Sequence, residues 1–304
     1  MSLVNGSVGD HLEARGNALH TPLGIYHRNE KLEMTRAHVR AAYPGPTTRL
    51  CVLVHGLGCH EGVWRFREGD ESYGSLLARD LGFTPVLVRY NTGLPVQRSG
   101  AALSLELSRL LRVYPVPVQE IVCVGHSMGG LVIRSACRHA TASRLGWVRR
   151  VTRVFYLGTP HDGADLERAT HVVERVLRAA PSAVARLVAD VLACRSAGIK
   201  DLRHGDTHDT DVAADVSRPA SRRPGRRQPR LEGARHYLVT GTISADVNHP
   251  ASVVLGDGLV RHRRRSAGVA SGQTHTRTFP GIGHLALANH PEVYGQIRRW
   301  CEEP

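Results

Sequence analysis

Short apolar runs bounded by turn residues recur along the chain, and in its first half they alternate with amphipathic stretches. Such runs are typical of strands that are buried on both faces, and they predict strands at 50–54, 85–90, 121–124, 151–157, 236–240 and 274–279. Helical spacing of apolar residues predicts helices at 30–42, 73–81, 101–112 and 129–141. Strands that alternate with helices of this length predict an α/β fold, with a mostly parallel sheet flanked by helices.

Residues 164–234 interrupt this alternation. The segment has helical periodicity at 166–179 and 182–193, and it ends in a low-complexity stretch rich in arginine and proline at 217–230. A stretch of that composition buries too little apolar surface to fold alone, so we expect an exposed or disordered loop there. We therefore predict a single domain over 1–304, with a helical cap or lid inserted at 164–234 between two strands of the sheet.

The strongest chemical signal is a Gly-x-Ser-x-Gly pattern, Gly125-His126-Ser127-Met128-Gly129, which stands between a predicted strand and a predicted helix. A serine in that setting occupies a tight, strained turn, and the glycines let the strand and the helix pack closely. Its Oγ then projects at the carboxyl end of the sheet, beside the helix N-terminus. The pattern is short enough to occur by chance, but its strand-turn-helix setting predicts that Ser127 is a nucleophile.

A nucleophilic serine needs amides that bind the oxyanion formed when it attacks a carbonyl. The sequence His55-Gly56-Leu57-Gly58 directly follows the first strong strand, and such a turn can direct its next N–H into the site. We predict that the backbone amides of Leu57 and Met128 form the oxyanion hole. We expect His55 and His126 to be structural neighbours of the site rather than bases.

The serine also needs a base, and the base needs an acid that orients it. His284 lies in a glycine-flanked turn, 281–285, after the last predicted strand, and is the predicted base. Asp257 completes the chain order of serine, acid and histidine. Asp246, which lies nearer the end of the preceding strand, is the alternative acid.

These motifs resemble those of α/β-hydrolases of the lipase/esterase branch. The segment Leu157-Gly158-Thr159-Pro160-His161-Asp162-Gly163 is similar to one that bacterial triacylglycerol lipases, and lipase domains resembling GPI inositol-deacylases, carry after the sixth strand. The segment Gly256-Asp257-Gly258-Leu259-Val260 resembles the acid-bearing segment of bacterial lipases. The resemblance covers about 50–163 and 236–300. It implies an α/β-hydrolase fold with Ser127, Asp257 and His284 as the catalytic triad.

From this chemistry we expect hydrolysis of carboxylic esters through an acyl-enzyme intermediate, with no cofactor. Acyl transfer and thioester hydrolysis use the same machinery and stand as alternatives. A non-catalytic binding module on the same fold is a third interpretation, and the intact set of Ser127, Asp257 and His284 counts against it. A cap over an apolar pocket favours a small-molecule or lipid-like ester over a polar substrate.

The chain of 304 residues carries a formal net charge of +13. Nearly all of its basic residues are arginines, with Lys31 and Lys200 as the two lysines, and no nucleic-acid-binding module accompanies the charge. We therefore expect no specific nucleic-acid partner. The basic tract at 261–265 is expected to be a solvated charge run, and peripheral contact with an anionic membrane surface is the alternative.

Several further features bear on location and metal content. The chain has no apolar stretch long enough to cross a membrane and no CxxC spacing among its six cysteines. Residues 1–10 have neither the basic nor the apolar region of a secretory signal, so we expect none. We therefore expect a cytoplasmic protein with free thiols. A group of metal-ligating residue types at 204–211 is expected to be a solvated loop, with a structural metal site as the alternative: His204, Asp206, His208, Asp209 and Asp211.

Overall fold

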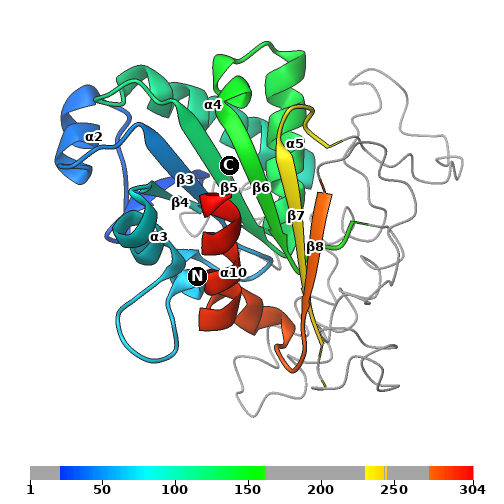
Figure 1. Ribbon diagram of the computed structural model, residues 1–304. Helices are drawn as coiled ribbons and strands as arrows, with labels where there is room; N and C mark the ends of the chain where they lie inside the picture. Colours follow the sequence, from blue (N-terminus) through cyan, green and yellow to red (C-terminus); the bar gives the residue numbers. More distant parts are fainter. Residues whose placement is uncertain (1–20, 162–229, 243, 245–273, 304) are drawn as a thin grey trace, which may run out of the picture.

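The computed structural model describes residues 21–161, 230–242, 244 and 274–303, and within them the strands form one sheet (Figure 1). The strand order is β2-β1-β4-β3-β5-β6-β7-β8. Strands β3 to β8 are parallel, whereas β1 pairs antiparallel with both β2 and β4. The bounds are β1 Gly24–His27, β2 Glu30–Lys31, β3 Arg49–Val54, β4 Thr84–Arg89, β5 Glu120–His126, β6 Val151–Leu157, β7 Arg235–Gly241 and β8 Thr274–Phe279.

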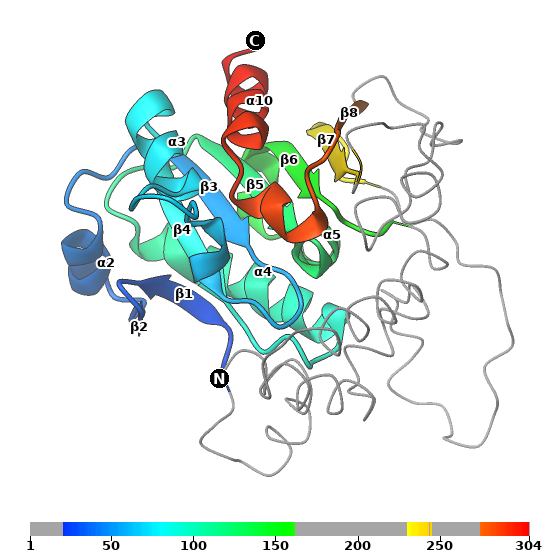
Figure 2. The same cartoon turned by 90° about the horizontal axis from the view of Figure 1, so that it is seen from below.

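Helices cover both faces of this sheet. Figure 2 shows α3 (Tyr73–Leu81) and α10 (Pro291–Glu302) on one face, with α4 (Val96–Val113) and α5 (Met128–Ala142) on the other. Helix α2 (Arg36–Ala42) packs on the α4 side through Val39. Three short 3-10 helices complete the described elements: η1 Glu61–Trp64, η2 Gly146–Arg150 and η3 His284–Ala288.

The central strands are apolar throughout because each sends alternate side chains into a separate core. In β3, Cys51 and Leu53 pack with α3 and α10, while Val52 and Val54 pack with α4 and α5. All four side chains are completely buried. A strand covered on both faces reads as a continuous apolar run, not as an alternation of apolar and polar residues. The predicted α/β fold class is therefore confirmed, together with the six predicted strands.

The N-terminal prediction was wrong in part, because the expected helix at 30–42 begins only at Arg36. Glu30 instead pairs with His27 across a two-residue turn. Both turn residues, Arg28 and Asn29, have positive φ, at 49° and 69°. Two successive residues with positive φ are what a tight hairpin turn of type I′ requires. Residues 30 and 31 therefore form a strand and not the start of a helix. The hairpin β1–β2 and the C-terminal helix α10 were not predicted.

The predicted cap at 164–234 and the tract at 217–230 lie outside the described residues, except for 230–234, which lead into β7. Among the helices of the described part, none is long and apolar enough to cross a membrane.

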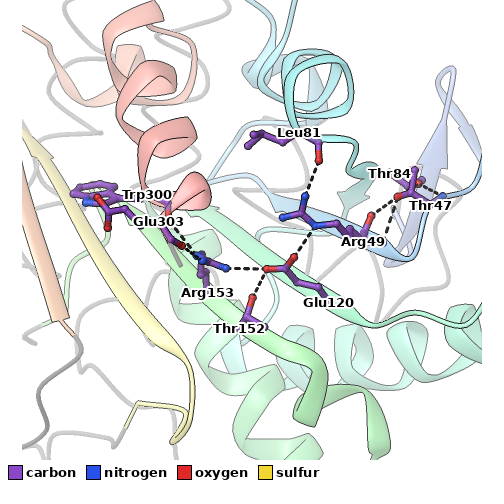
Figure 3. Close-up of polar contacts among 9 residues, drawn as sticks. All are labelled: Thr47, Arg49, Leu81, Thr84, Glu120, Thr152, Arg153, Trp300 and Glu303. Carbon is purple, nitrogen blue, oxygen red and sulfur yellow. Dashed lines mark hydrogen bonds and ion pairs between the residues drawn. The ribbon is translucent and has the colours of Figure 1, made fainter.

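A polar network joins β3, β5 and β6 at the amino end of the sheet (Figure 3). The Glu120 carboxylate accepts from Arg49 Nε at 2.7 Å, from Thr152 Oγ1 at 2.7 Å and from an Arg153 guanidinium nitrogen at 2.9 Å. The two arginines also donate to backbone carbonyls at the ends of α3 and α10, namely those of Leu81, Trp300 and Glu303. The network therefore fixes three parallel strands and two helices relative to one another.

Burial alone would raise the pKa of the Glu120 carboxyl, but the Thr152 and Arg49 hydrogen bonds and the Arg49 and Arg153 charges hold that pKa below its usual value. A carboxyl whose pKa is lower in the folded than in the unfolded state stabilises the fold above its unfolded pKa. The stabilisation is lost as the pH falls through the folded pKa.

We expect Glu120→Gln to lower the free energy of unfolding by about 2 kcal/mol at pH 7, because it leaves two partly buried guanidinium groups without their carboxylate. The difference from the wild type should shrink in acid, as the pH falls below the usual pKa of a glutamate carboxyl toward the lowered pKa of folded Glu120. Urea unfolding between pH 3 and pH 8 measures both effects. The control is Glu302→Gln, whose partner Arg298 is about half exposed, and which should change stability by no more than about 0.5 kcal/mol. An equal loss in both variants would contradict the prediction.

Candidate active site

Ser127 forms the one-residue turn between β5 and α5, and its backbone is strained. Its φ is 53° and its ψ is −124°, in the region that side-chain-bearing residues rarely adopt. Two hydrogen bonds hold the turn: Ser127 N donates to Leu157 O at 2.8 Å, and Gly130 N donates to Ser127 O at 3.1 Å. The serine predicted as the nucleophile therefore has the strained strand-to-helix geometry that its motif indicates.

The glycines after Ser127 are required by close packing. A Cβ built on Gly129 would lie 2.1 Å from Val54 O, and one built on Gly130 would lie 2.1 Å from Thr159 Oγ1. Atoms cannot approach that closely, so any larger residue at either position would push the start of α5 away from the sheet. The start of α5 therefore rests directly on the end of β3 and on the segment after β6.

The turn predicted to supply an oxyanion amide lies against Ser127. A Cβ built on Gly56 would be 2.9 Å from Ser127 Cβ. Gly56 O accepts from Cys59 N at 3.2 Å, Gly58 has a φ of 68°, and Gly58 N donates to Thr92 Oγ1 at 3.1 Å. The sequence carries no signal for Thr92 as a partner of this turn, because Gly58 follows β3 and Thr92 follows β4, 34 residues later.

Neither of the two amides predicted to form the oxyanion hole donates a hydrogen bond to a described residue. Leu57 N–H and Met128 N–H have no hydrogen-bond acceptor among the residues that the structure describes. Met128 supplies the first amide of α5, and the first amides of an α-helix have no acceptor inside the helix. No described residue therefore competes with an incoming oxygen atom for either N–H group.

His55 is completely buried beneath the oxyanion turn. Its ring stacks on Tyr90 at 4.6 Å, and its Nδ1 lies 2.9 Å from Gly56 O. Burial lowers the pKa of His55 to about 4, although the hydrogen bond to Gly56 opposes the shift. The imidazole is therefore neutral near pH 7, and its hydrogen bond to Gly56 O stabilises the turn.

His284 begins η3, directly after the turn that follows β8, and it is 6% exposed. Its ring centroid lies 4.9 Å from that of His126, the residue before Ser127. Its loop is tied to the end of β7, because Gly281 N donates to Ser244 O at 3.0 Å. The structure thus brings the predicted base and the predicted nucleophile to the same end of the sheet.

A tyrosine distant in the sequence hydrogen-bonds the segment that follows His284. The Tyr73 hydroxyl on α3 lies 2.9 Å from Leu287 O and 3.0 Å from His290 O, and it accepts from His290 N at 3.1 Å. The sequence offers no signal for this contact, because the partners are more than 200 residues apart.

The predicted acid Asp257 and its alternative Asp246 lie outside the described residues, as do the metal-ligand group at 204–211 and the basic tract at 261–265. Within the part of the chain that the structure covers, no three His, Cys, Asp or Glu side chains gather in a way that could hold a metal ion.

The strand order, the strained serine between β5 and α5 and the histidine after the last strand together define the α/β-hydrolase fold. Residues 93–206, less than half of the chain, match the family model described as a PGAP1-like alpha/beta domain. The resemblance seen in the sequence motifs is thereby confirmed at the level of the fold. None of the curated proteins compared with the chain matches it in sequence.

Solved structures similar to the chain include three esterase-related proteins. Esterase RhEst1 from Rhodococcus sp. ECU1013 is 13% identical with a TM-score of 0.45, covering 85% of this chain and 92% of its own. A lipase-esterase related protein from Clostridium acetobutylicum ATCC 824 is 10% identical with a TM-score of 0.44, covering 83% and 94%. A thermophilic esterase from Thermogutta terrifontis is 17% identical with a TM-score of 0.40, covering 85% and 90%. The fold assignment rests on the strand order and the Ser127 turn.

We expect Gly130→Ala to lower the free energy of unfolding by about 1–3 kcal/mol, the usual cost of overpacking. The Thr159 hydroxyl that it meets is buried and makes no hydrogen bond with a described residue, so Thr159→Ala alone should cost little. In the double variant the nearest remaining atom is Thr159 Cβ at 3.0 Å, and most of the loss should be recovered. A double-mutant cycle by urea unfolding measures this coupling.

The matched control is Gly295→Ala in α10, where a Cβ would meet no atom within 4 Å. There the change should stabilise the protein by about 0.5–1 kcal/mol, because alanine is the better helix former. Equal losses in Gly130→Ala and in the double variant would show that the contact with Thr159 is not what excludes a side chain.

Proposed function

We propose that the protein is a serine hydrolase that cleaves carboxylic esters, with Ser127 as the nucleophile, His284 as the base and Asp257 as the acid. The observation that carries the proposal is the strained Ser127 turn, with two amides that no described residue accepts from and the His284 loop at the same end of the sheet. Ser127 follows the carboxyl end of a parallel strand, where the active sites of such sheets form. Backbone strain at a polar residue in that place indicates a functional position.

In the proposed reaction His284 takes the Ser127 proton while Ser127 Oγ attacks the ester carbonyl carbon. The Leu57 and Met128 amides hold the resulting oxyanion, each contributing about 3 kcal/mol of transition-state stabilisation. The C–O bond of the ester then breaks, and the imidazolium of His284 gives its proton to the leaving alcohol. His284 then takes a proton from a water molecule, which attacks the acyl-enzyme carbonyl carbon. The bond between the acyl group and Ser127 Oγ breaks, the imidazolium returns its proton to Oγ, and the acid leaves. Asp257 orients the imidazole and stabilises its charged form.

We propose a small-molecule or lipid-like ester as the substrate, with the segment at 164–234 as the cap over its acyl chain. The reaction needs no cofactor, because the side chains supply the nucleophile and the proton transfers. The free thiols of the described cysteines support a reducing, cytoplasmic location: Cys51, Cys59, Cys123, Cys137 and Cys301.

We expect the wild type to hydrolyse p-nitrophenyl esters, and Ser127→Ala and His284→Ala to lose about 10⁴-fold or more in kcat. An ester series from two to sixteen carbons measures the activity, and the preferred chain length gives the size of the acyl pocket. The matched control is Ser143→Ala, at the opposite end of α5, which should keep wild-type kinetics. Full activity in Ser127→Ala would overturn the proposal. Inertness of the folded wild type on every ester would also exclude simple ester hydrolysis, and thioesters and alcohol acceptors would then be assayed.

The acid is tested by comparing Asp257→Asn with Asp246→Asn. We expect Asp257→Asn to lower kcat about 10²–10⁴-fold, because an amide cannot stabilise the imidazolium. Asp246→Asn should stay within about threefold of the wild type, a change of well under 1.4 kcal/mol. The opposite ranking would move the acid to Asp246 and leave the rest of the mechanism in place.

A further inference from the structure

His126 contacts the proposed base from 158 residues away in the sequence. Its side chain is buried, and its Nε2 lies 3.0 Å from the backbone oxygen of His284. The two rings also pack together, with centroids 4.9 Å apart and planes tilted by 50°. The residue that precedes the proposed nucleophile thus bonds to the backbone of the proposed base.

The hydrogen bond assigns a proton to Nε2 of His126. A backbone carbonyl can only accept, so the imidazole nitrogen must donate, and in the neutral ring Nδ1 then carries no proton. Nδ1 lies beside the oxyanion turn, since a Cβ built on Gly56 would be 3.1 Å from it. The His126 ring therefore stands between the oxyanion turn and the His284 loop.

Aromatic side chains hold both sides of this contact. The rings of Trp64 and His126 form a T-shaped pair, with centroids 6.5 Å apart and planes at 81°, and the Trp64 ring packs on that of Tyr73 at 6.0 Å. Tyr73 in turn hydrogen-bonds the carbonyl of Leu287, in the 3-10 helix that His284 begins. Trp64 and Tyr73 are fully buried, so a chain of packed side chains connects the His126 ring to η3 through the core.

We propose that His126 is a positioning residue for His284. Its Nε2–H fixes the carbonyl of His284 and thereby the point at which η3 leaves the β8 turn, so that the base has one placement toward Ser127. His126 exchanges no proton with substrate. The inference rests on the proposed function, in which a general base must reach the serine hydroxyl within hydrogen-bond distance.

A positioning role and a space-filling role require different properties of the side chain at position 126. A space-filling side chain could be replaced by any apolar group of similar volume, whereas a positioning role requires an N–H three bonds beyond Cβ. Gln supplies that N–H at its Nε2, whereas Leu has no donor. Asn carries its N–H one bond too near the backbone, at the place of the imidazole Nδ1. The three substitutions therefore separate donor position from volume and polarity.

We expect His126→Leu to lower kcat about 10- to 100-fold, the effect of misplacing a catalytic group by a fraction of an ångström to 1 Å. KM should stay within about threefold, because the substrate surface is unchanged. His126→Gln should recover at least half of the loss on a logarithmic scale, and His126→Asn should behave like His126→Leu. The measurements are ester kinetics and the rate at which a fluorophosphonate probe labels Ser127, with thermal unfolding to establish that each variant folds.

The matched control is His236→Leu in β7. His236 is 4% exposed and its Nε2 lies 2.9 Å from Leu231 O, so the variant also loses a hydrogen bond from a buried imidazole to a carbonyl, at a site away from His284. It should keep wild-type kcat and labelling rate per folded molecule. A folded His126→Leu with wild-type rates, or a His126→Gln as slow as His126→Leu, would overturn the positioning role.

Two outcomes separate this inference from the proposed function. A wild type whose Ser127 reacts with neither esters nor the fluorophosphonate removes the proposed function and the inference with it. A wild type that labels at Ser127 but cleaves no ester removes only ester hydrolysis. The labelling rates of His126→Leu and His126→Gln then decide the positioning role. Should His126→Leu fail to fold, the comparison of His126→Asn with His126→Gln decides it.

Discussion

The left-handed backbone of Ser127 costs about 1–3 kcal/mol, and the surrounding structure has to hold it. Leu157 O accepts its N–H, and Gly130 N donates to its carbonyl, so both polar backbone atoms of the strained residue are bonded. The start of α5 can lie in this position only because Gly129 and Gly130 bring it against β3 and Thr159. Strand order, helix placement and the strained backbone of Ser127 are thus parts of one packing arrangement.

The two ends of the parallel strands have different physical roles. At the amino end, Glu120 binds Arg49 and Arg153 and locks three strands together. At the carboxyl end, the turns after β3, β5 and β8 carry Gly56, Ser127 and His284. In parallel sheets ligands bind beyond the carboxyl ends of the strands. In the described part of the chain, the ion-pair network thus lies at one end of the strands, and the backbone strain and the amides without an acceptor lie at the other.

The parts of the fold that the sequence predicted are those encoded by local patterns. The buried strands are continuous apolar runs, and Ser127 lies in a short motif whose glycines are needed for contacts with adjacent elements. The hairpin at Arg28 and Asn29 was missed because neither residue is a glycine, although both have positive φ. The contacts of His126 with His284 and of Tyr73 with Leu287 join residues more than 150 positions apart, where no local pattern records the pairing.

Arginine chemistry inside the fold also changes how the basic composition is interpreted. Arg49 combines a carboxylate, the Leu81 carbonyl and the face of Phe83, whose ring centroid is 4.1 Å from its guanidinium carbon. Arg89 likewise bonds Glu61 and lies 4.2 Å over Tyr26. Such combinations need a planar group with several donors, which lysine does not have. The preference for arginine over lysine therefore serves intramolecular contacts at these positions, and the positive charge does not by itself require a polyanionic partner.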